Sequence, residues 1–220
     1  LSLEKIVNSK TTKLTGLFLL IFLTATSHIK AQLFDDWQSR PSISLKHDLN
    51  NKWSVSGTYY QYFDNNISDF DKAVFGGKVN YEFNDWLKAG ANYRWGVEKH
   101  DNYHDLRYSL LFEPELNLGK WQFGYQTMFQ QKLADGQKPD NYLRNLLQVN
   151  YQLSPVVRLF ALTENYLSIY HGAKHDTQKY ALGSEFEITE RSSIEFQFTV
   201  KERHKHKRYV RLELSYSHEF

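Results

Sequence analysis

The chain has 220 residues, a net charge of +2 from 27 Lys and Arg against 25 Asp and Glu, and no cysteine. Without cysteine, disulfide scaffolds, Cys-ligated zinc and thiol catalysis are excluded. Aromatic residues make up 16% of the chain and the mean hydropathy is −0.61, so composition alone indicates an aromatic-rich β protein of one domain or two small ones.

The N-terminal segment has the pattern of a secretory signal peptide. Two lysines precede an apolar run over residues 14–23, which is too short to span a bilayer as a helix. Small residues follow, and we place cleavage after Ala31, with Ser27 as a competing end point; a buried N-terminal helix is the alternative. Because residues 1–31 hold four Lys and one Glu, the remaining chain has a net charge of −1. Overall charge therefore gives no support for nucleic-acid binding.

Residues 53–220 alternate between apolar and polar positions almost throughout, which predicts β-strands. The pattern is clearest over residues 73–83, 121–130, 192–201 and 208–217. Short turn signals alternate with longer polar loops, and successive short turns are about 35 residues apart. Each repeat holds two long strands rather than the four short strands of a propeller blade, so we predict an up-and-down meander of hairpins.

Strand length indicates a membrane. Globular strands average ~5–6 residues, whereas strands that cross an outer membrane need ~9–11. Long strands with one apolar face, short turns at one end and long loops at the other are typical of outer-membrane barrels. Trp53, Trp86 and Trp121 each follow a short turn, where an aromatic girdle would meet lipid headgroups. A soluble lipocalin-like barrel is the alternative; we predict an all-β, up-and-down antiparallel transmembrane β-barrel of about 10 strands (range 8–12).

The C-terminal pattern favours the membrane barrel over the soluble one. The chain ends at Phe220, preceded at alternate positions by Tyr216, Leu214 and Leu212. This arrangement resembles the C-terminal signal by which the barrel-assembly machinery recognises outer-membrane proteins, and it implies that machinery as a partner. His218 departs from the signal, because that position usually carries Tyr or another apolar residue.

Several motifs of the chain resemble those of one family. They are the Leu49-Asn50-Asn51-Lys52-Trp53-Ser54 turn, the Asn84-Asp85-Trp86 turn leading into Tyr93-Arg94-Trp95, and alternating strands that carry Arg. Together they resemble the domain-of-unknown-function-2490 family of small outer-membrane β-barrels. The resemblance implies a barrel in the envelope of a Gram-negative bacterium, and it implies no activity.

The segment before the first predicted strand raises a question of topology. Ten strands from Trp53 to the end place the short turns in the periplasm and the long loops outside the cell. Residues 41–49 also alternate, but as an eleventh spanning strand they would place the N-terminus outside. We therefore predict a signal peptide over residues 1–31, a periplasmic or luminal segment over 32–52, and the barrel over 53–220.

The charges on the predicted inward faces have mixed and nearly balanced signs. Selective pores favour rings of one sign, whereas charges that pair with one another suit a filled lumen. A barrel of about ten strands also lies near the size that side chains fill. We predict a non-enzymatic structural or binding component of the envelope with a largely plugged lumen; a narrow solute pore is the alternative. The inward charges are Lys78, Glu82, Lys88, Arg94, Arg107, Glu113, Glu115, Arg144, Arg158, Glu164, Lys179, Glu185, Glu187, Glu195, Lys201, Arg211 and Glu213.

An outer-membrane hydrolase acting on lipid or peptide is the rival function. It needs a Ser nucleophile with a His base. Ser217 and His218 are adjacent in a strand, so their side chains point to opposite faces, and no G-x-S-x-G motif occurs. Ser168 with His171, and three His-Asp pairs in the loops, are unspecific. We assign no catalytic residue and no cofactor.

Histidine placement gives the candidate metal site. Six of the 9 histidines fall in three outer loops, spaced i, i+4 or as His-x-His, and imidazole suits zinc, copper or nickel. Because the fourth and fifth loops are neighbours, the candidate ligands are His171, His175, His204 and His206; solvated loop histidines are the alternative.

Six Lys and Arg between Lys201 and Arg211 would meet lipopolysaccharide phosphates at the outer surface, unless they only form a charged hairpin. The predicted partners are thus outer-membrane lipids and, through Phe220, the barrel-assembly machinery, with no nucleic acid. The oligomeric state is left open.

Overall fold

Alternating apolar and polar residues form long strands throughout the computed structural model, which describes residues 34–99, 104–134, 138–169, 174–203 and 207–220. These strands have 12 to 16 residues, more than the ~9–11 that cross an outer membrane. Within the described ranges, no helix is long and apolar enough to span a membrane. The strands are β1 (Asp36–Asp48), β2 (Trp53–Asp64), β3 (Asp69–Asn84), β4 (Leu87–Glu98), β5 (His104–Leu118), β6 (Trp121–Ala134), β7 (Asp140–Ser154), β8 (Val157–Ser168), β9 (Lys174–Thr189), β10 (Ser192–Arg203) and β11 (Lys207–Glu219).

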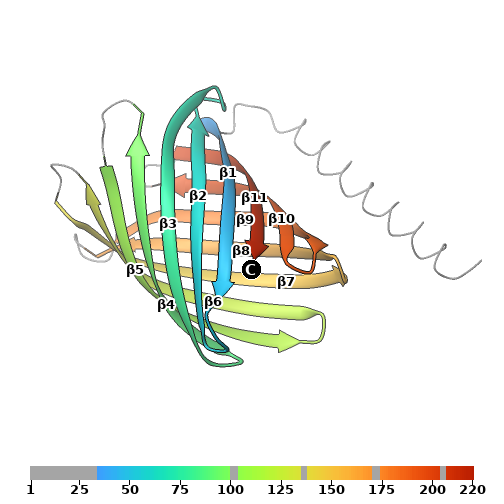
Figure 1. The fold of residues 1–220 in the computed structure, drawn as a ribbon. Coiled ribbons are helices and arrows are strands. Elements are labelled where there is room, and N and C mark those ends of the chain that lie inside the picture. The colour runs from blue at the N-terminus through green and yellow to red at the C-terminus, as the bar shows by residue number, and fades with distance from the viewer. Residues whose placement is uncertain (1–33, 100–103, 135–137, 170–173, 204–206) are drawn as a thin grey trace, which may run out of the picture. The chain divides into compact units, whose positions relative to one another are not determined.

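The strands close into one barrel. Each pairs antiparallel with the next in sequence, as expected for a repeat of hairpins. The last seam is different, because β1 lies between β2 and β11 and runs parallel to β11 (Figure 1). Its register runs from Asp36 opposite Tyr209 to Lys46 opposite Glu219. The all-β up-and-down barrel is therefore confirmed, with one parallel seam.

The place of β1 corrects the expected role of residues 32–52. Residues 36–48 are a wall strand and not a periplasmic or luminal segment, so the ten strands from Trp53 are joined by an eleventh. Bacterial outer-membrane barrels usually have an even number of strands, and a parallel seam is what allows an odd one. The physical reason is closure. β1 pairs with β2 along one edge and with β11 along the other, so its backbone groups are satisfied within the wall, as a lipid environment requires.

Side chains reinforce the parallel seam. Arg40 of β1 pairs with Glu213 of β11, and the Ser42 hydroxyl donates a hydrogen bond of 2.7 Å to the Ser215 hydroxyl. These contacts lie on the inner side of the wall, two residues apart on each strand. The seam is therefore joined by polar side chains as well as by its backbone ladder.

The β2–β3 loop holds the first residues of β1. Asn65, Asn66 and Ile67 have φ of 51°, 58° and 67°, the left-handed region that a β-branched residue rarely adopts. Two hydrogen bonds hold this conformation: the Asn66 N–H donates to the Asp36 carboxylate over 2.8 Å, and the Ile67 N–H donates to the Trp37 carbonyl over 3.1 Å. The loop thus ties the start of β1 to its antiparallel neighbour.

The outer face of the wall is apolar. Ile43, Phe75, Leu110, Leu182 and Leu214 all point outward from different strands, and Leu110 and Leu182 are each 60% exposed. So much exposed apolar surface suits a lipid environment and not water. The lipocalin-like alternative, which needs a charged outer face, is therefore wrong.

An aromatic girdle rings one end of this face. Trp53, Trp86 and Trp121 are 44%, 57% and 47% exposed, and each lies beside a short turn, as the sequence predicts. Ring centroids of Trp53 and Tyr81 are 4.8 Å apart, and those of Trp121 and Tyr151 are 4.7 Å apart. Such amphipathic rings sit at the membrane–water interface of known membrane proteins.

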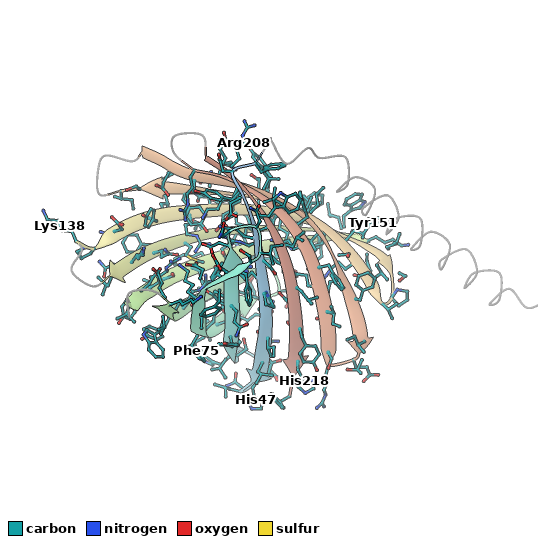
Figure 2. The ribbon with its side chains drawn as sticks, turned by 90° about the horizontal axis from the view of Figure 1, so that it is seen from above. His47, Phe75, Lys138, Tyr151, Arg208 and His218 are labelled. Carbon is teal, nitrogen blue, oxygen red and sulfur yellow. The ribbon has the colours of Figure 1, made fainter. Side chains whose placement is uncertain are left out.

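The two ends of the barrel are named here by their connections. The turn end holds the β1–β2, β3–β4, β5–β6, β7–β8 and β9–β10 turns, and His47 of β1, His218 of β11 and Phe220 also lie there (Figure 2). The loop end holds the other five connections and the start of β1. Those connections have three to five residues, fewer than the sequence predicts, because the strands continue into the expected loops.

Candidate functional site

A cavity of about 630 Å³ occupies the loop-end half of the lumen, and we call it the chamber. Because strand side chains alternate between faces, the apolar outer face forces the polar positions of the strands inward. Eleven cationic and five acidic side chains line the chamber, an excess of six positive charges. The cations are Arg40, Lys72, Lys78, Arg94, Arg107, Lys132, Arg144, Lys179, Lys201, Arg203 and Arg211, and the acids are Asp64, Asp71, Glu164, Asp176 and Glu213.

The most buried ion pairs of the chamber centre on Glu164 of β8. Its carboxylate accepts a hydrogen bond of 2.9 Å from Arg144 Nε and one of 2.8 Å from Lys179 Nζ. Arg144 also donates to the Gln130 side chain over 2.7 Å. The Tyr166 ring lies 4.4 Å from the Arg144 guanidinium and 4.7 Å from the Lys179 ammonium. One carboxylate therefore compensates two buried cations.

A second buried carboxylate plays the same part on β5. Asp105 is 3% exposed and accepts a hydrogen bond of 2.9 Å from Arg107 Nε, while Lys132 Nζ lies 3.8 Å away. At the parallel seam, Glu213 pairs with Arg40 and accepts a hydrogen bond from a β10 threonine. These acids stabilise part of the positive charge of the chamber.

Four chamber cations lack such a partner. Among the described residues, no carboxylate lies within ion-pair distance of Arg94, Lys201, Arg203 or Arg211. Arg211 is the most buried of the four, at 8% exposed. It donates one hydrogen bond of 2.8 Å, to the Gln38 side chain, and its Nε has no partner in the described chain.

Tyrosine rings contact several cations of the chamber, including the unpaired Arg94 and Arg211. Arg211 lies 4.9 Å from the centre of the Tyr62 ring, and Lys72 lies 5.5 Å from the same ring. The Tyr60 ring has Arg40 at 5.4 Å and Arg94 at 6.0 Å. Cation–π contacts of this kind orient a cation without neutralising its charge. The cations therefore remain able to bind an anion.

Three apolar side chains point into the lumen, and we call Leu111, Met128 and Phe160 the floor; the first two also line the chamber. They point inward from β5, β6 and β8, yet they are only 1%, 4% and 6% exposed. An inward side chain with so little exposure must have other side chains packed around it in the lumen. Gly183 allows part of this packing, because a Cβ there would overlap the Phe160 ring.

The turn-end half of the lumen, beyond the floor, is more acidic and more hydrogen-bonded. Arg158 pairs there with Glu185, and a chain of side-chain hydrogen bonds runs from Asn150 through Gln122 to Glu115, with lengths of 2.6 and 2.8 Å. The inward carboxylates of this half are Asp48, Glu82, Glu113, Glu115, Glu185, Glu187, Glu195 and Glu219, and its inward cations are Lys46, Lys88 and Arg158. Glu113 pairs with Lys78 of the chamber.

A comparison with family models decides the identity of this barrel. The model described as "Protein of unknown function (DUF2490)" matches residues 37–211. The chain belongs to this family. A search of curated proteins finds no match.

Solved structures show the same fold. The DUF2490 chain is similar to the NanC porin, with a TM-score of 0.52 and 13% identity over 79% of this chain and 90% of that one. It is also similar to a bacterial polysaccharide outer membrane secretin, with a TM-score of 0.50 and 10% identity over 76% of this chain. The match spans 64% of the secretin's length, less than two thirds. Identities this low show the fold alone, which is that of an outer-membrane β-barrel.

The inward charges predicted for this DUF2490 chain do line its interior, and nine of them line the chamber. Sequence reasoning missed four further cations there, Arg40, Lys72, Lys132 and Arg203. Arg40 was missed because β1 was left out of the wall. The other three lie near strand ends that were expected to be loops.

Of the hydrolase candidates of the DUF2490 chain, Ser217 and His218 do not form a site, whereas His171 and the His100-Asp101 pair lie outside the described residues. Ser217 and His218 point to opposite faces, as expected, and His218 Nδ1 lies 2.9 Å from the Ser192 hydroxyl on β10 instead. Sequence reasoning missed this pair, because it depends on the β10–β11 register. The Tyr216 hydroxyl lies 3.3 Å from Ser192 as well. All of these groups belong to the turn end.

The predicted metal ligands fall largely outside the described residues. His171, His204 and His206 lie there, and only the backbone of His175 is described, in β9 opposite Leu167. Among the residues that the structure describes, no group of three His, Asp or Glu is placed to hold a metal ion. Metal binding by the four histidines stays a prediction, which zinc titration of the wild-type protein and of a His204→Ala/His206→Ala variant would test.

Proposed function

We propose that this DUF2490 protein is a non-enzymatic outer-membrane barrel that holds a small solute in its chamber and is closed toward the turn end. The observation that carries this proposal is the floor. Leu111, Met128 and Phe160 are almost fully buried although they point into the lumen. Beyond them, the hydrogen-bonded side chains of the turn-end half fill more of the interior.

The proposal includes an orientation in the membrane. Outer-membrane barrels keep their short turns in the periplasm, so the chamber would face outward and the girdle at Trp53, Trp86 and Trp121 would meet the inner leaflet headgroups. The partners would be outer-membrane lipids on the apolar face and the barrel-assembly machinery at Phe220. Accessibility of a single cysteine introduced at exposed Lys138, compared with one at exposed Lys120, would test the orientation in intact cells.

Planar-bilayer recordings test the closed floor. Wild-type protein should show little steady conductance, whereas a Met128→Ala/Phe160→Ala variant should conduct, because both changes remove side chains from the floor. A Phe75→Ala variant, altered only on the outer face, is the matched control and should stay silent. Large stable currents from the wild-type protein would overturn the proposal.

A narrow solute pore is the second candidate function. The chamber itself favours it, since it shows that part of the lumen is unfilled. The NanC porin, whose name describes a pore, shares the fold. The recordings above separate the two candidates, because a pore conducts without any change to its floor.

A further inference from the structure

The unpaired cations of the chamber lower the stability of the folded barrel, and the barrel fold does not require them. Burying a charge without a partner is unfavourable, and a protein normally avoids it with an ion pair. Arg144, Lys179 and Arg107 are compensated in this way by Glu164 and Asp105. Arg211 is at least as buried, yet no described carboxylate compensates it and its Nε has no partner.

The remaining unpaired cations belong to the same cavity. Arg94, Lys201 and Arg203 line the chamber together with Arg211, and they come from β4, β10 and β11. Tyr60 and Tyr62 hold the guanidinium groups of Arg94 and Arg211. Cations on separate strands, oriented by fixed rings, form a site prepared before its ligand arrives.

We propose that the chamber is a binding site for a small multivalent anion, a compound that carries a phosphate group or several carboxylates. Arginine suits this chemistry, because its planar guanidinium matches the two oxygens of a carboxylate or phosphate. An anion with two or three negative charges would compensate the unpaired cations, and its oxygens would accept the free hydrogen bond of Arg211 Nε. A cavity of about 630 Å³ has room for a molecule the size of a sugar phosphate.

This inference rests on the proposed function only in that the chamber holds a solute. The two fail separately. A barrel that conducts and binds anions would overturn the closed floor alone, and a silent barrel that binds none would overturn the anion site alone.

Calorimetry on the refolded barrel tests the anion site, in zwitterionic detergent and in a buffer free of phosphate and carboxylates. The probes are glucose 6-phosphate, inorganic phosphate, citrate and, as the neutral comparison, glucose. Saturable binding of glucose 6-phosphate without binding of glucose is the expected result. Binding of phosphate and glucose 6-phosphate but not citrate would identify a phosphate site, and the reverse a polycarboxylate site.

Charge-neutral variants locate the site. Arg211→Gln should weaken anion binding at least tenfold, and Lys201→Gln, at a more exposed position, provides the same test if the first variant folds poorly. Lys88→Gln removes one positive charge from the turn-end half and should leave the affinity unchanged. Equal weakening in Lys201→Gln and Lys88→Gln would mean that the anion responds only to overall charge, and equal affinities in all three proteins would mean that it binds outside the chamber; either result would overturn the proposal.

Thermal unfolding gives an independent measurement. Without ligand, Arg211→Gln should unfold at the same temperature as the wild type or higher, since no ion pair is lost. Glucose 6-phosphate should raise the unfolding temperature of the wild type and not that of the variant, because only a ligand that binds the folded state stabilises it. A variant that is destabilised and still shifted by the ligand would show that Arg211 has a structural role.

Discussion

The two halves of the lumen obey the same rule of alternation but carry opposite charge. Eleven cations and five acids line the cavity of the loop-end half, and three acids outside the lining, Glu98, Asp105 and Glu113, pair with lining cations, whereas carboxylates outnumber cations in the turn-end half. The proposed floor at Leu111, Met128 and Phe160 is almost fully buried. In the turn-end half, the inward cations Lys46, Lys88 and Arg158 all pair with carboxylates; in the loop-end half, four cations are left without an acid. This difference is the basis of the proposed anion site in the chamber.

The largest expected effect comes from removing the acid that compensates two cations of the chamber. Glu164→Gln leaves Arg144 and Lys179 buried without a carboxylate, and breaking a buried pair in this way costs about 3–5 kcal/mol. Urea unfolding of the refolded barrel measures the loss. A loss of unfolding free energy below about 1 kcal/mol would mean that water solvates these two cations. The chamber would then be as wet as the turn-end half, and the two halves would not differ in this respect.

A second variant shows whether that loss comes from uncompensated charge. Adding Arg144→Gln to Glu164→Gln removes one of the two stranded cations and should recover part of the stability. A double-mutant cycle then isolates the coupling between the two residues. Simple additivity of the two changes would show that they do not interact across the β7–β8 pair.

The next effect concerns the floor between the halves. Gly183→Ala places a methyl group against the Phe160 ring, and overpacking of this kind costs about 1–3 kcal/mol. Gly124→Ala is the matched control, because it also lies on a lumen-facing position of a strand and a Cβ there meets no atom within 4 Å. The same unfolding measurement should show no loss for the control. Equal effects at both glycines would mean that the floor is loosely packed.

The sequence predicts the face of each charge but not its height in the barrel. Alternation assigned Arg94 and Glu115 correctly to the inner face, because the period of two fixes the face without any tertiary knowledge. Whether two charges lie at the same height along the barrel axis depends on strand tilt and register. The sequence of a single strand does not determine either. Hence the signs seemed balanced along the sequence, while in the barrel they separate into two halves.

The strand β1 was missed for a related reason. Its alternation over residues 41–49 is visible in the sequence, but an eleventh spanning strand would place the N-terminus outside, and that argument decided against it. Only the structure shows that β1 pairs in parallel with β11, so that the backbone groups on both edges of β1 are hydrogen-bonded. The contact between Ser192 and His218 likewise requires the register of two strands.

A smaller effect is expected from a lumen ion pair of the turn-end half. Arg158 pairs with Glu185, but the side chain of Arg158 is 37% exposed and that of Glu185 is 18% exposed, against 9% and 5% for Arg144 and Glu164. Arg158→Ala should therefore cost about 1 kcal/mol, because water can solvate the remaining carboxylate. A loss as large as that of Glu164→Gln would show that the turn-end half is as dry as the chamber wall.

The smallest effect is expected at the rim of the turn end. Lys88 Nζ lies 3.8 Å from Glu82, and the two side chains are 41% and 40% exposed. Exposed pairs of this kind contribute about 0–1 kcal/mol and are screened by salt, so Lys88→Gln should change the unfolding free energy by less than about 0.5 kcal/mol. The measurement is repeated at low and high salt, where the small difference should shrink further. A loss above about 1 kcal/mol that persists in high salt would contradict this expectation. It would show that the Lys88–Glu82 pair is shielded from water by lipid or a partner, and that the turn-end half also holds a strongly bound charge.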